Sequence, residues 1–527
     1  MNRKYNEEII KYVIKLVNNG FKVTPATIKM CETFNLKYNE SVGRYFRRLM
    51  QNSGVTNNVE RIEISDAFQM AQKKEIENNK NKFIITWCQS ETDIHEKFLD
   101  NIESYSKKIN AQILIIAGRY KNPTSLYSSK NIEADEENVE SKWNKRTIPY
   151  LDAARHYIHN HLCVLSDVKI QPTSSTPLSG MNNITGVESC IIGHPRVHLR
   201  SLPVLDGYSN KLLLTTGSIS IENYTDTKVG KKSEFHHQYG FVVVELDGDI
   251  FHVRQVVADK NGDFYDLIYE VKKGVVSENK KGVNAIVWGD LHLGDEDEIA
   301  LKTSFDMANK LKANKIVLHD VVNSHSISHH EKRDPFQLLQ REEDGSWSLK
   351  NELKNVEDFF NNNKKHSFIV IRSNHDEFID RWLMNEDWRK TPNKLLYLNF
   401  ANIIANGEAP KGIIPYVLTK QTTNTYCLGV DESKVINGWE VGMHGHIGVH
   451  GSKPSPIQLK NLPIKTITGH THVPHREDGH LSVGTLTKLR LGYNKGASAW
   501  LHSNVVIYPN GKTSHIHIID GKYTTLI

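Results

Sequence analysis

The chain has 527 residues, 38% of them hydrophobic and 24% charged, which is typical of a globular protein with several domains. It has no apolar run near the roughly 18 residues of a membrane-spanning helix, no apolar N-terminal segment, and five cysteines without a C-x-x-C pair. We therefore expect a cytoplasmic protein without disulfide bonds, and neither a membrane protein nor an exported one. The net charge of +5 is concentrated in residues 1–55, which hold ten lysines and arginines against four glutamates.

Residues 1–55 are predicted to form a small helical head whose third helix is basic. That helix carries Arg44, Arg47 and Arg48 on its outer face. Such a head resembles a helix-turn-helix module, whose last helix enters the major groove of DNA, so these arginines are candidates for nucleic-acid contact. The alternative is a basic bundle that only docks on the rest of the protein. The expected helices are Asn6–Asn18, a segment that opens after Thr24, and a segment that starts at Asn39 or Ser41.

The next two segments differ in composition. Residues 56–81 are polar and rich in Asn, Lys and Glu, so we expect a linker there. Residues 82–275 are predicted to form a mixed α/β domain of unknown role, followed by a second linker at Lys272–Gly282. The expected elements of this domain are a helix at Asp93–Lys108 and strands at Phe83–Trp87, Gln112–Ala117, Cys163–Ile170, Leu212–Thr216, Gly240–Leu246 and Asp249–Val256.

The chemistry is concentrated after residue 283. Of 26 histidines, 14 lie between His292 and His480, where five short apolar strands each end in a polar cluster. Strand ends of this kind converge at the carboxyl edge of a sheet, and Asp, Asn and His together suit Mn²⁺, Fe or Zn²⁺. The five clusters are Asp290-Leu291-His292, His319-Asp320-Val321-Val322-Asn323, Asn374-His375-Asp376, His444-Gly445-His446 and His470-Thr471-His472.

These blocks, in this order, resemble the signature of the calcineurin-like metallophosphoesterase superfamily over about residues 283–500. The resemblance implies an α/β fold in which residues 283–527 form a β-sandwich flanked by helices. It also implies two divalent metal ions, with Mn²⁺ favoured and Fe, Zn²⁺ and Mg²⁺ as alternatives. The implied ligands are Asp290, His292 and His472 for one metal, Asn374, His444 and His470 for the other, and Asp320 for both.

The resemblance implies catalytic roles for two further residues. His375 would steady the phosphoryl oxygen or protonate the leaving group, and Asp376 would orient His375. His446 competes with His444 for the position of the ligand. His319 and Ser373 stand where the family has glycine, which alters the expected shape of the pocket more than its metal content.

A loop between Asp320 and Asn374 supplies further candidates for contact with backbone phosphates, with a solvated loop as the alternative reading. These candidates are His329, His330, Lys332 and Arg333.

A basic head fused to a two-metal hydrolase favours DNA as the substrate, and a metal-dependent DNase is our first hypothesis. A phosphatase or nucleotide phosphodiesterase, and a catalytically idle DNA-binding regulator, are the alternatives. The layout also resembles the pre-early DNA-transfer proteins of siphophages that inject their genome in two steps. This implies a role in degrading host DNA and in DNA transfer within the host bacterial cytoplasm. Whether the chain forms a homo-oligomer or binds another phage protein is left open.

Overall fold

The computed structural model describes residues 5–18, 23–52, 74–77, 79–119, 143–328, 335–343, 345, 347–492 and 494–527. The chain divides into two compact units, Met1–Phe68 and Gln69–Ile527. Most of the linker expected at residues 56–81 lies outside the described residues. Its last part is attached to the larger unit, because the backbone N–H groups of Lys74 and Glu77 donate to Asp152 and Gln112.

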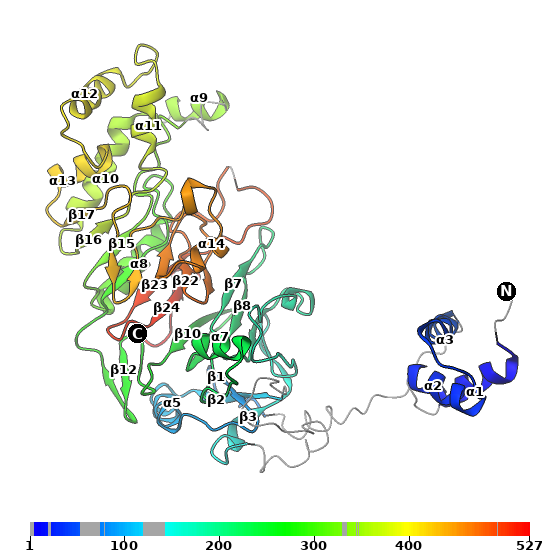
Figure 1. Ribbon diagram of the computed structural model, residues 1–527. Coiled ribbons are helices and arrows are strands. Elements are labelled where there is room, and N and C mark those ends of the chain that lie inside the picture. Colours follow the sequence, from blue (N-terminus) through cyan, green and yellow to red (C-terminus); the bar gives the residue numbers. More distant parts are fainter. Residues whose placement is uncertain are drawn as a thin grey trace. The chain divides into compact units, whose positions relative to one another are not determined.

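The smaller unit contains the three helices that the sequence predicts (Figure 1). They are α1 (Glu7–Asn18), α2 (Val23–Thr33) and α3 (Glu40–Asn52). Their apolar faces meet in a core that includes Val13, Met30 and Phe46, all fully buried. Asn39 caps α3, since its side-chain oxygen accepts from the backbone N–H groups of Ser41 and Val42. The opposite face of α3 exposes Arg44 and Arg47, while the side chain of Arg48 lies outside the description.

The larger unit is a mixed α/β structure with four sheets. The six-stranded sheet has the order β17 (Thr425–Cys427), β16 (Phe368–Val370), β15 (Ile316–Leu318), β14 (Ala285–Val287), β23 (Ser503–Ile507) and β24 (Thr513–His517). The ten-stranded sheet has the order β18 (Val435–Ile436), β19 (Trp439–Glu440), β20 (Lys465–Thr468), β22 (His480–Ser482), β21 (His475–Glu477), β7 (Leu199–Leu202), β8 (Lys211–Thr215), β6 (Ser189–Ile192), β5 (Leu162–Leu165) and β4 (Arg155–His159).

Two smaller sheets and nine described helices complete this unit. The five-stranded sheet has the order β10 (Ile250–Val257), β9 (Gly240–Asp247), β1 (Lys82–Gln89), β2 (Gln112–Gly118) and β3 (Leu151–Asp152), and the three-stranded sheet comprises β11 (Phe264–Asp266), β12 (Tyr269–Lys272) and β13 (Val275–Glu278). The helices are α5 (Glu96–Ile109), α7 (Lys228–His236), α8 (Glu298–Lys310), α9 (Pro335–Glu343), α10 (Leu349–Asn362), α11 (Phe378–Asn385), α12 (Lys394–Ala405), α13 (Ile413–Gln421) and α14 (Pro456–Lys460).

The six-stranded sheet is covered on both faces. Alternate residues of its strands point in opposite directions, so Ile286 packs in a core with α8, α10 and α13. Its neighbours Ala285 and Val287 pack instead in a core with Trp439 and Ile467 of the ten-stranded sheet. Two stacked sheets with helices outside them are therefore present, and the mixed α/β class is confirmed.

Strands from both halves of the larger unit share the ten-stranded sheet. His475 of β21 lies opposite Arg200 of β7, and the two strands are antiparallel. The expected division between residues 82–275 and 283–527 thus stays a prediction, and one sheet crosses it. The segment Lys272–Gly282, expected to be a linker, contains β13, which pairs with β12 as a hairpin. This hairpin was not predicted from the sequence because its strands have only four residues each and contain several polar side chains.

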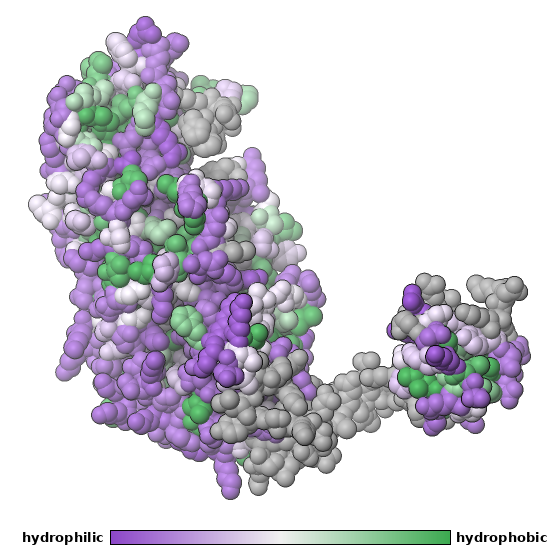
Figure 2. Space-filling model, viewed as in Figure 1, coloured by the Kyte–Doolittle hydropathy of each residue, from purple (hydrophilic) through white to green (hydrophobic). Residues whose placement is uncertain are grey.

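Hydrophilic residues cover most of the visible face of the larger unit, with an apolar group over α12, where Leu395 and Leu398 are exposed (Figure 2). Among the helices that the structure describes, none has the length and apolar character needed to span a bilayer.

Candidate metal centre

The predicted ligands follow the carboxyl ends of strands in the two stacked sheets. Strands β14, β15 and β16 are parallel to one another, and so are β19 and β20. The residues after these strands therefore emerge at matching edges. Asp290 and His292 follow β14, Asp320 follows β15, Asn374 follows β16, His444 follows β19, and His470 and His472 follow β20.

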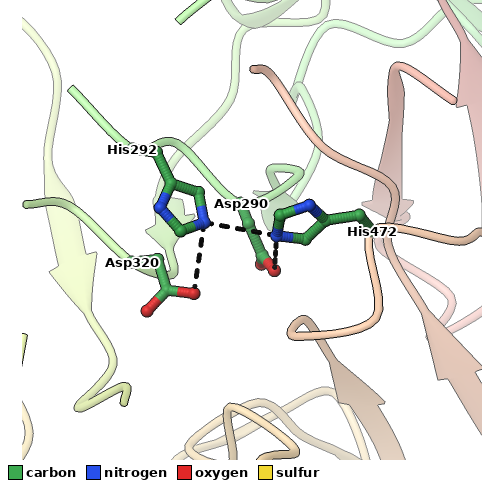
Figure 3. Close-up of side chains that lie close together, drawn as sticks. All are labelled: Asp290, His292, Asp320 and His472. Atoms are coloured by element: carbon green, nitrogen blue, oxygen red, sulfur yellow. Dashed lines mark hydrogen bonds and ion pairs between the residues drawn. The ribbon is translucent and has the colours of Figure 1, made fainter. Parts of the chain in front are cut away.

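Four of these side chains form one buried cluster (Figure 3). His292 Nε2 lies 3.2 Å from His472 Nε2 and 3.4 Å from Asp320 Oδ2, and His472 Nε2 lies 3.2 Å from Asp290 Oδ2. Their ligand atoms all lie within 4.8 Å of one another. One metal ion could therefore contact all four residues.

The remaining predicted ligands form a second set beside the first. His444 Nε2 lies 2.9 Å from Asn374 Oδ1, and His470 Nδ1 lies 3.2 Å from the same oxygen. His444 Nε2 is also 3.1 Å from Asp320 Oδ2, the oxygen that faces His292 in the first cluster. One carboxylate oxygen of Asp320 is thus shared by both sets.

The backbone at these residues is strained. Asp320, His292, His470 and His472 have φ angles of 46°, 46°, 73° and 58°, in the left-handed region that side chains other than glycine rarely adopt. Strain of this kind is concentrated at functional sites, because the surrounding structure must hold it.

The residues fit divalent metal ions. Asp290 Oδ1 is buried and has no hydrogen-bond partner within the described residues, which leaves a carboxylate oxygen available for a cation. Nitrogen and oxygen donors without thiolate suit Mn²⁺, Fe or Zn²⁺. Position 469 has no room for a side chain, since a Cβ at Gly469 would lie 2.1 Å from Asp290 Oδ1.

Electrostatics keep the first cluster in the protonation state that metals require. Burial lowers the pKa of His292 to about 3, so its ring is neutral. Burial raises the pKa of Asp290, but the hydrogen bond from His472 and the charges of His444 and His472 together outweigh this effect and lower it to about 2. In the second set, burial lowers the pKa of His444, but Asp320 together with the charges of Asp290 and Asp376 raises it to about 9. Ionised carboxylates and neutral imidazoles are the forms that bind metal, and a bound cation would displace the proton from His444.

His375 lies beside both sets. Its backbone N–H donates to Asp320 Oδ1 at 3.2 Å, and its ring centre is 4.4 Å from that of His292. Ring atom Nδ1 lies 3.2 Å from the carbonyl oxygen of Asn323. When Nδ1 carries the proton, this carbonyl accepts it and fixes the orientation of the ring.

Among the described residues no hydrogen bond joins the Asp376 carboxylate to the ring of His375, and the expected role of Asp376 in orienting His375 stays a prediction. The Asp376 carboxylate instead accepts from the backbone N–H of Val322 at 3.1 Å and from Ser373 Oγ at 2.8 Å. Burial raises its pKa to about 7. Asp376 therefore ties together the loops after β15 and β16, and Ser373, in place of glycine, is its partner.

The geometry favours His444 over His446 as the ligand. His446 Nε2 is 3.9 Å from Glu377 Oε1, whereas His444 contacts Asn374 and Asp320. The sequence reasoning missed His319 as a donor: its ligand atom lies within 4.8 Å of those of Asp290 and His444. Its position directly before Asp320 in the sequence could have indicated that it lies near the metal centre.

The candidates for DNA contact stay predictions. Arg44 and Arg47 belong to the smaller unit. His329, His330, Lys332 and Arg333 lie outside the described residues.

Comparison with known proteins identifies one related protein. Protein A1 of Escherichia phage T5 is 30% identical over 466 residues, which cover 84% of this chain and 82% of that protein. The chain belongs to the Protein A1 family. This relationship supports the expectation of a phage protein.

Other comparisons add little. No protein-family model matches the chain. Two solved structures of Vps29 from Chaetomium thermophilum share 11% and 12% identity with it. The free form covers 38% of this chain and 95% of its own, with a TM-score of 0.21. The complex with a cyclic peptide covers 35% and 94%, with a TM-score of 0.20. Scores this low assign no fold.

Proposed function

We propose that this member of the Protein A1 family is a two-metal phosphodiesterase of the calcineurin-like type that hydrolyses DNA in the host bacterial cytoplasm. The observation that carries the proposal is the position of Asp320 Oδ2, which faces His292 of one ligand set and His444 of the other. A shared carboxylate suits two cations held close together, because its negative charge offsets their repulsion.

The chain's own residues have distinct parts in this reaction. The two ligand sets hold the metal ions, which when bound supply a nucleophilic hydroxide and stabilise charge on the phosphoryl group. His375 is the proton carrier: with Nδ1 facing the Asn323 carbonyl, Nε2 is the atom that can donate a proton to the leaving oxygen. Asp376 is a positioning residue for the loops that carry Asp320 and Asn374.

DNA is the proposed substrate because of the basic head. Exposed Arg44 and Arg47 on α3 can contact phosphates without reading sequence. We propose that host DNA is the target and that its degradation supports phage DNA transfer, with Mn²⁺ as the favoured metal.

A small phosphoester is the second candidate. A pocket of about 500 Å³ is lined by His444 and His446 together with Glu377 and Glu432, a size that accommodates a small molecule. A nucleotide phosphodiesterase would use such a pocket.

Hydrolysis assays separate these candidates. Plasmid DNA, linear duplex DNA and a generic phosphodiester should each be incubated with the purified chain and Mn²⁺, Mg²⁺ or EDTA. We expect metal-dependent cleavage of DNA that His375→Ala lowers by about 10²-fold or more, while DNA binding persists. His161→Ala, a histidine outside the centre, is the matched control and should retain activity. Cleavage of the generic phosphodiester with inert DNA would favour the small-molecule enzyme, and wild-type turnover by His375→Ala would refute the assignment.

A further inference from the structure

A second pocket lies at the opposite ends of the strands that lead to the metal centre. It has a volume of about 380 Å³ and lies between the end of α7 and strands β19, β20 and β21. Trp439 and Lys465, which begin β19 and β20, line it, whereas the metal ligands follow the other ends. A four-residue strand extends about 10 Å, so this pocket is separate from the metal centre. We call it the basic pocket.

Asp478, the acidic residue in the lining, and its neighbour Glu477 both have cationic partners. Asp478 Oδ1 lies 2.9 Å from Arg196 Nη1 and 3.1 Å from His198 Nε2. Glu477 lies 2.6 Å from Lys460 Nζ. These contacts offset the negative charges of Asp478 and Glu477.

Three further cations line the pocket, and none of them forms an ion pair within 4.0 Å among the described residues, although the charge of Asp259 acts on Lys512. Arg476 is only 6% exposed, and its guanidinium donates to the carbonyl oxygen of Thr513 at 3.0 Å. Lys465 Nζ lies 5.5 Å from the ring centre of Trp439. Across the described part of the chain, neither these two side chains nor that of Lys512 forms an ion pair within 4.0 Å. Thr513 Oγ1, also in the lining, is buried and has no hydrogen-bond partner among the described residues.

Holding these charges together is costly without an anion. Burial lowers the pKa of Arg476 to about 10. Burial, together with the charges of Lys465 and Arg476, lowers the pKa of Lys512 to about 8. Buried charges are retained in proteins when a counter-charge compensates for their lost hydration, and a phosphate group would supply it here.

The remaining lining suits an uncharged, flat group. Val197, Leu462 and Ile464 provide an apolar wall, and Phe235, which is 80% exposed, adds an aromatic ring. Aromatic rings bind nucleobases by stacking. A volume of about 380 Å³ falls in the range of small-molecule pockets.

We propose that the basic pocket binds a nucleoside phosphate, with the phosphate at Arg476 and Lys512 and the base against Phe235. Two ligands offer a phosphate joined to a nucleoside: a free mononucleotide and one nucleotide of a DNA strand. The site is independent of the metal centre and of the function proposed for it.

Titration calorimetry with the full chain tests this site. EDTA is present throughout so that metal-bound phosphate does not contribute. The probes are 2′-deoxyadenosine 5′-monophosphate, deoxyadenosine, inorganic phosphate and a short single-stranded oligonucleotide. We expect the monophosphate to bind more tightly than either of its parts, and Lys512→Gln to raise its Kd about tenfold or more. Lys465→Gln should weaken binding in the same direction, while Lys354→Gln, on the exposed face of α10, should not change it.

The other possible results either contradict the proposal, in part or as a whole, or identify the source of the nucleotide. No binding of the monophosphate at millimolar concentration, or an unchanged Kd in both pocket variants, would overturn it. Inorganic phosphate binding as tightly as the monophosphate would refute the base contact, and equal binding of deoxyadenosine would refute the phosphate contact. Tighter binding of the oligonucleotide, lost in Lys512→Gln, would identify a DNA strand as the source; weaker binding would identify the free nucleotide. Because no turnover is measured, failure of the DNase assay leaves this result intact.

Discussion

Replacing Arg254 by methionine would remove the counter-charge of two buried carboxylates. Its guanidinium Nε lies 2.6 Å from Asp266 Oδ1, its Nη2 lies 2.8 Å from Asp266 Oδ2, and its Nη1 donates to Glu245. The Arg254 side chain is 2% exposed and both carboxylates are fully buried. These residues come from β10, β11 and β9, so the network links two sheets of the larger unit.

The size of the effect follows from this burial. Removing one partner of a buried ion pair costs about 3–5 kcal/mol, because the remaining charge has neither water nor a counterion. Methionine keeps much of the side-chain volume, so a cavity adds little. For a unit of roughly 460 residues, the entropy of unfolding is about 1 kcal/mol/K, and the Tm should therefore fall by about 3–5 °C.

Differential scanning calorimetry of the full chain measures this change. Arg155→Met is the matched control: Arg155 pairs with Asp167 at 3.1 Å, but the two side chains are 30% and 28% exposed. An exposed pair contributes less than about 1 kcal/mol, so this variant should shift the Tm by under about 1 °C. Equal shifts in the two variants would refute the argument from burial.

Three further predictions concern the metal centre, acid stability and the head. Mn²⁺ at about a hundred times its Kd should stabilise the wild type by about 2.7 kcal/mol, and Asp320→Asn, which keeps the shape of the shared ligand but removes its charge, should abolish the rise in Tm. Burial raises the pKa of Glu245, but the charge and hydrogen bond of Arg254 together with the hydrogen bonds from Thr525 outweigh this and lower it to about 2, below its ordinary 4.5. Its stabilisation, of about 3 kcal/mol, is complete above pH 4.5 and is lost as the pH falls towards 2, which urea unfolding at several pH values would show; a flat profile would contradict it. Deleting residues 1–55 should raise the Kd for DNA and flatten its dependence on salt in fluorescence anisotropy, and unchanged affinity would exclude the head as a DNA module.

The positions of the candidate metal ligands after the strands could be predicted because they depend on local pattern. Short apolar runs such as Ile316–Leu318 are recognisable as buried strands, and the polar residues after them stand out against that background. The three helices of the head were predicted for the same reason, since apolar residues recur at helical spacing in Glu7–Asn18. Both signals lie within about ten residues of chain.

Long-range pairing could not be predicted in this way. Strand β24 reads Thr-Ser-His-Ile-His, yet all five residues are buried, because the strand also packs against β10. Its polar composition gives no sign of this environment. The bonds of Asp376 to Val322 and Ser373 depend equally on how two loops meet, which a motif does not encode.

The pairing of β21 with β7 limits how this protein can be divided. Two residues separate His472 from β21, so a cut that removes β7 exposes an unpaired strand edge close to a candidate metal ligand. A fragment starting at residue 283 would therefore contain every predicted ligand and still be an aggregation-prone half of a sheet. Recombination between related genes faces the same limit: a crossover between residues 202 and 475 joins a β7 from one parent to a β21 from the other, whose side chains have not been selected to fit.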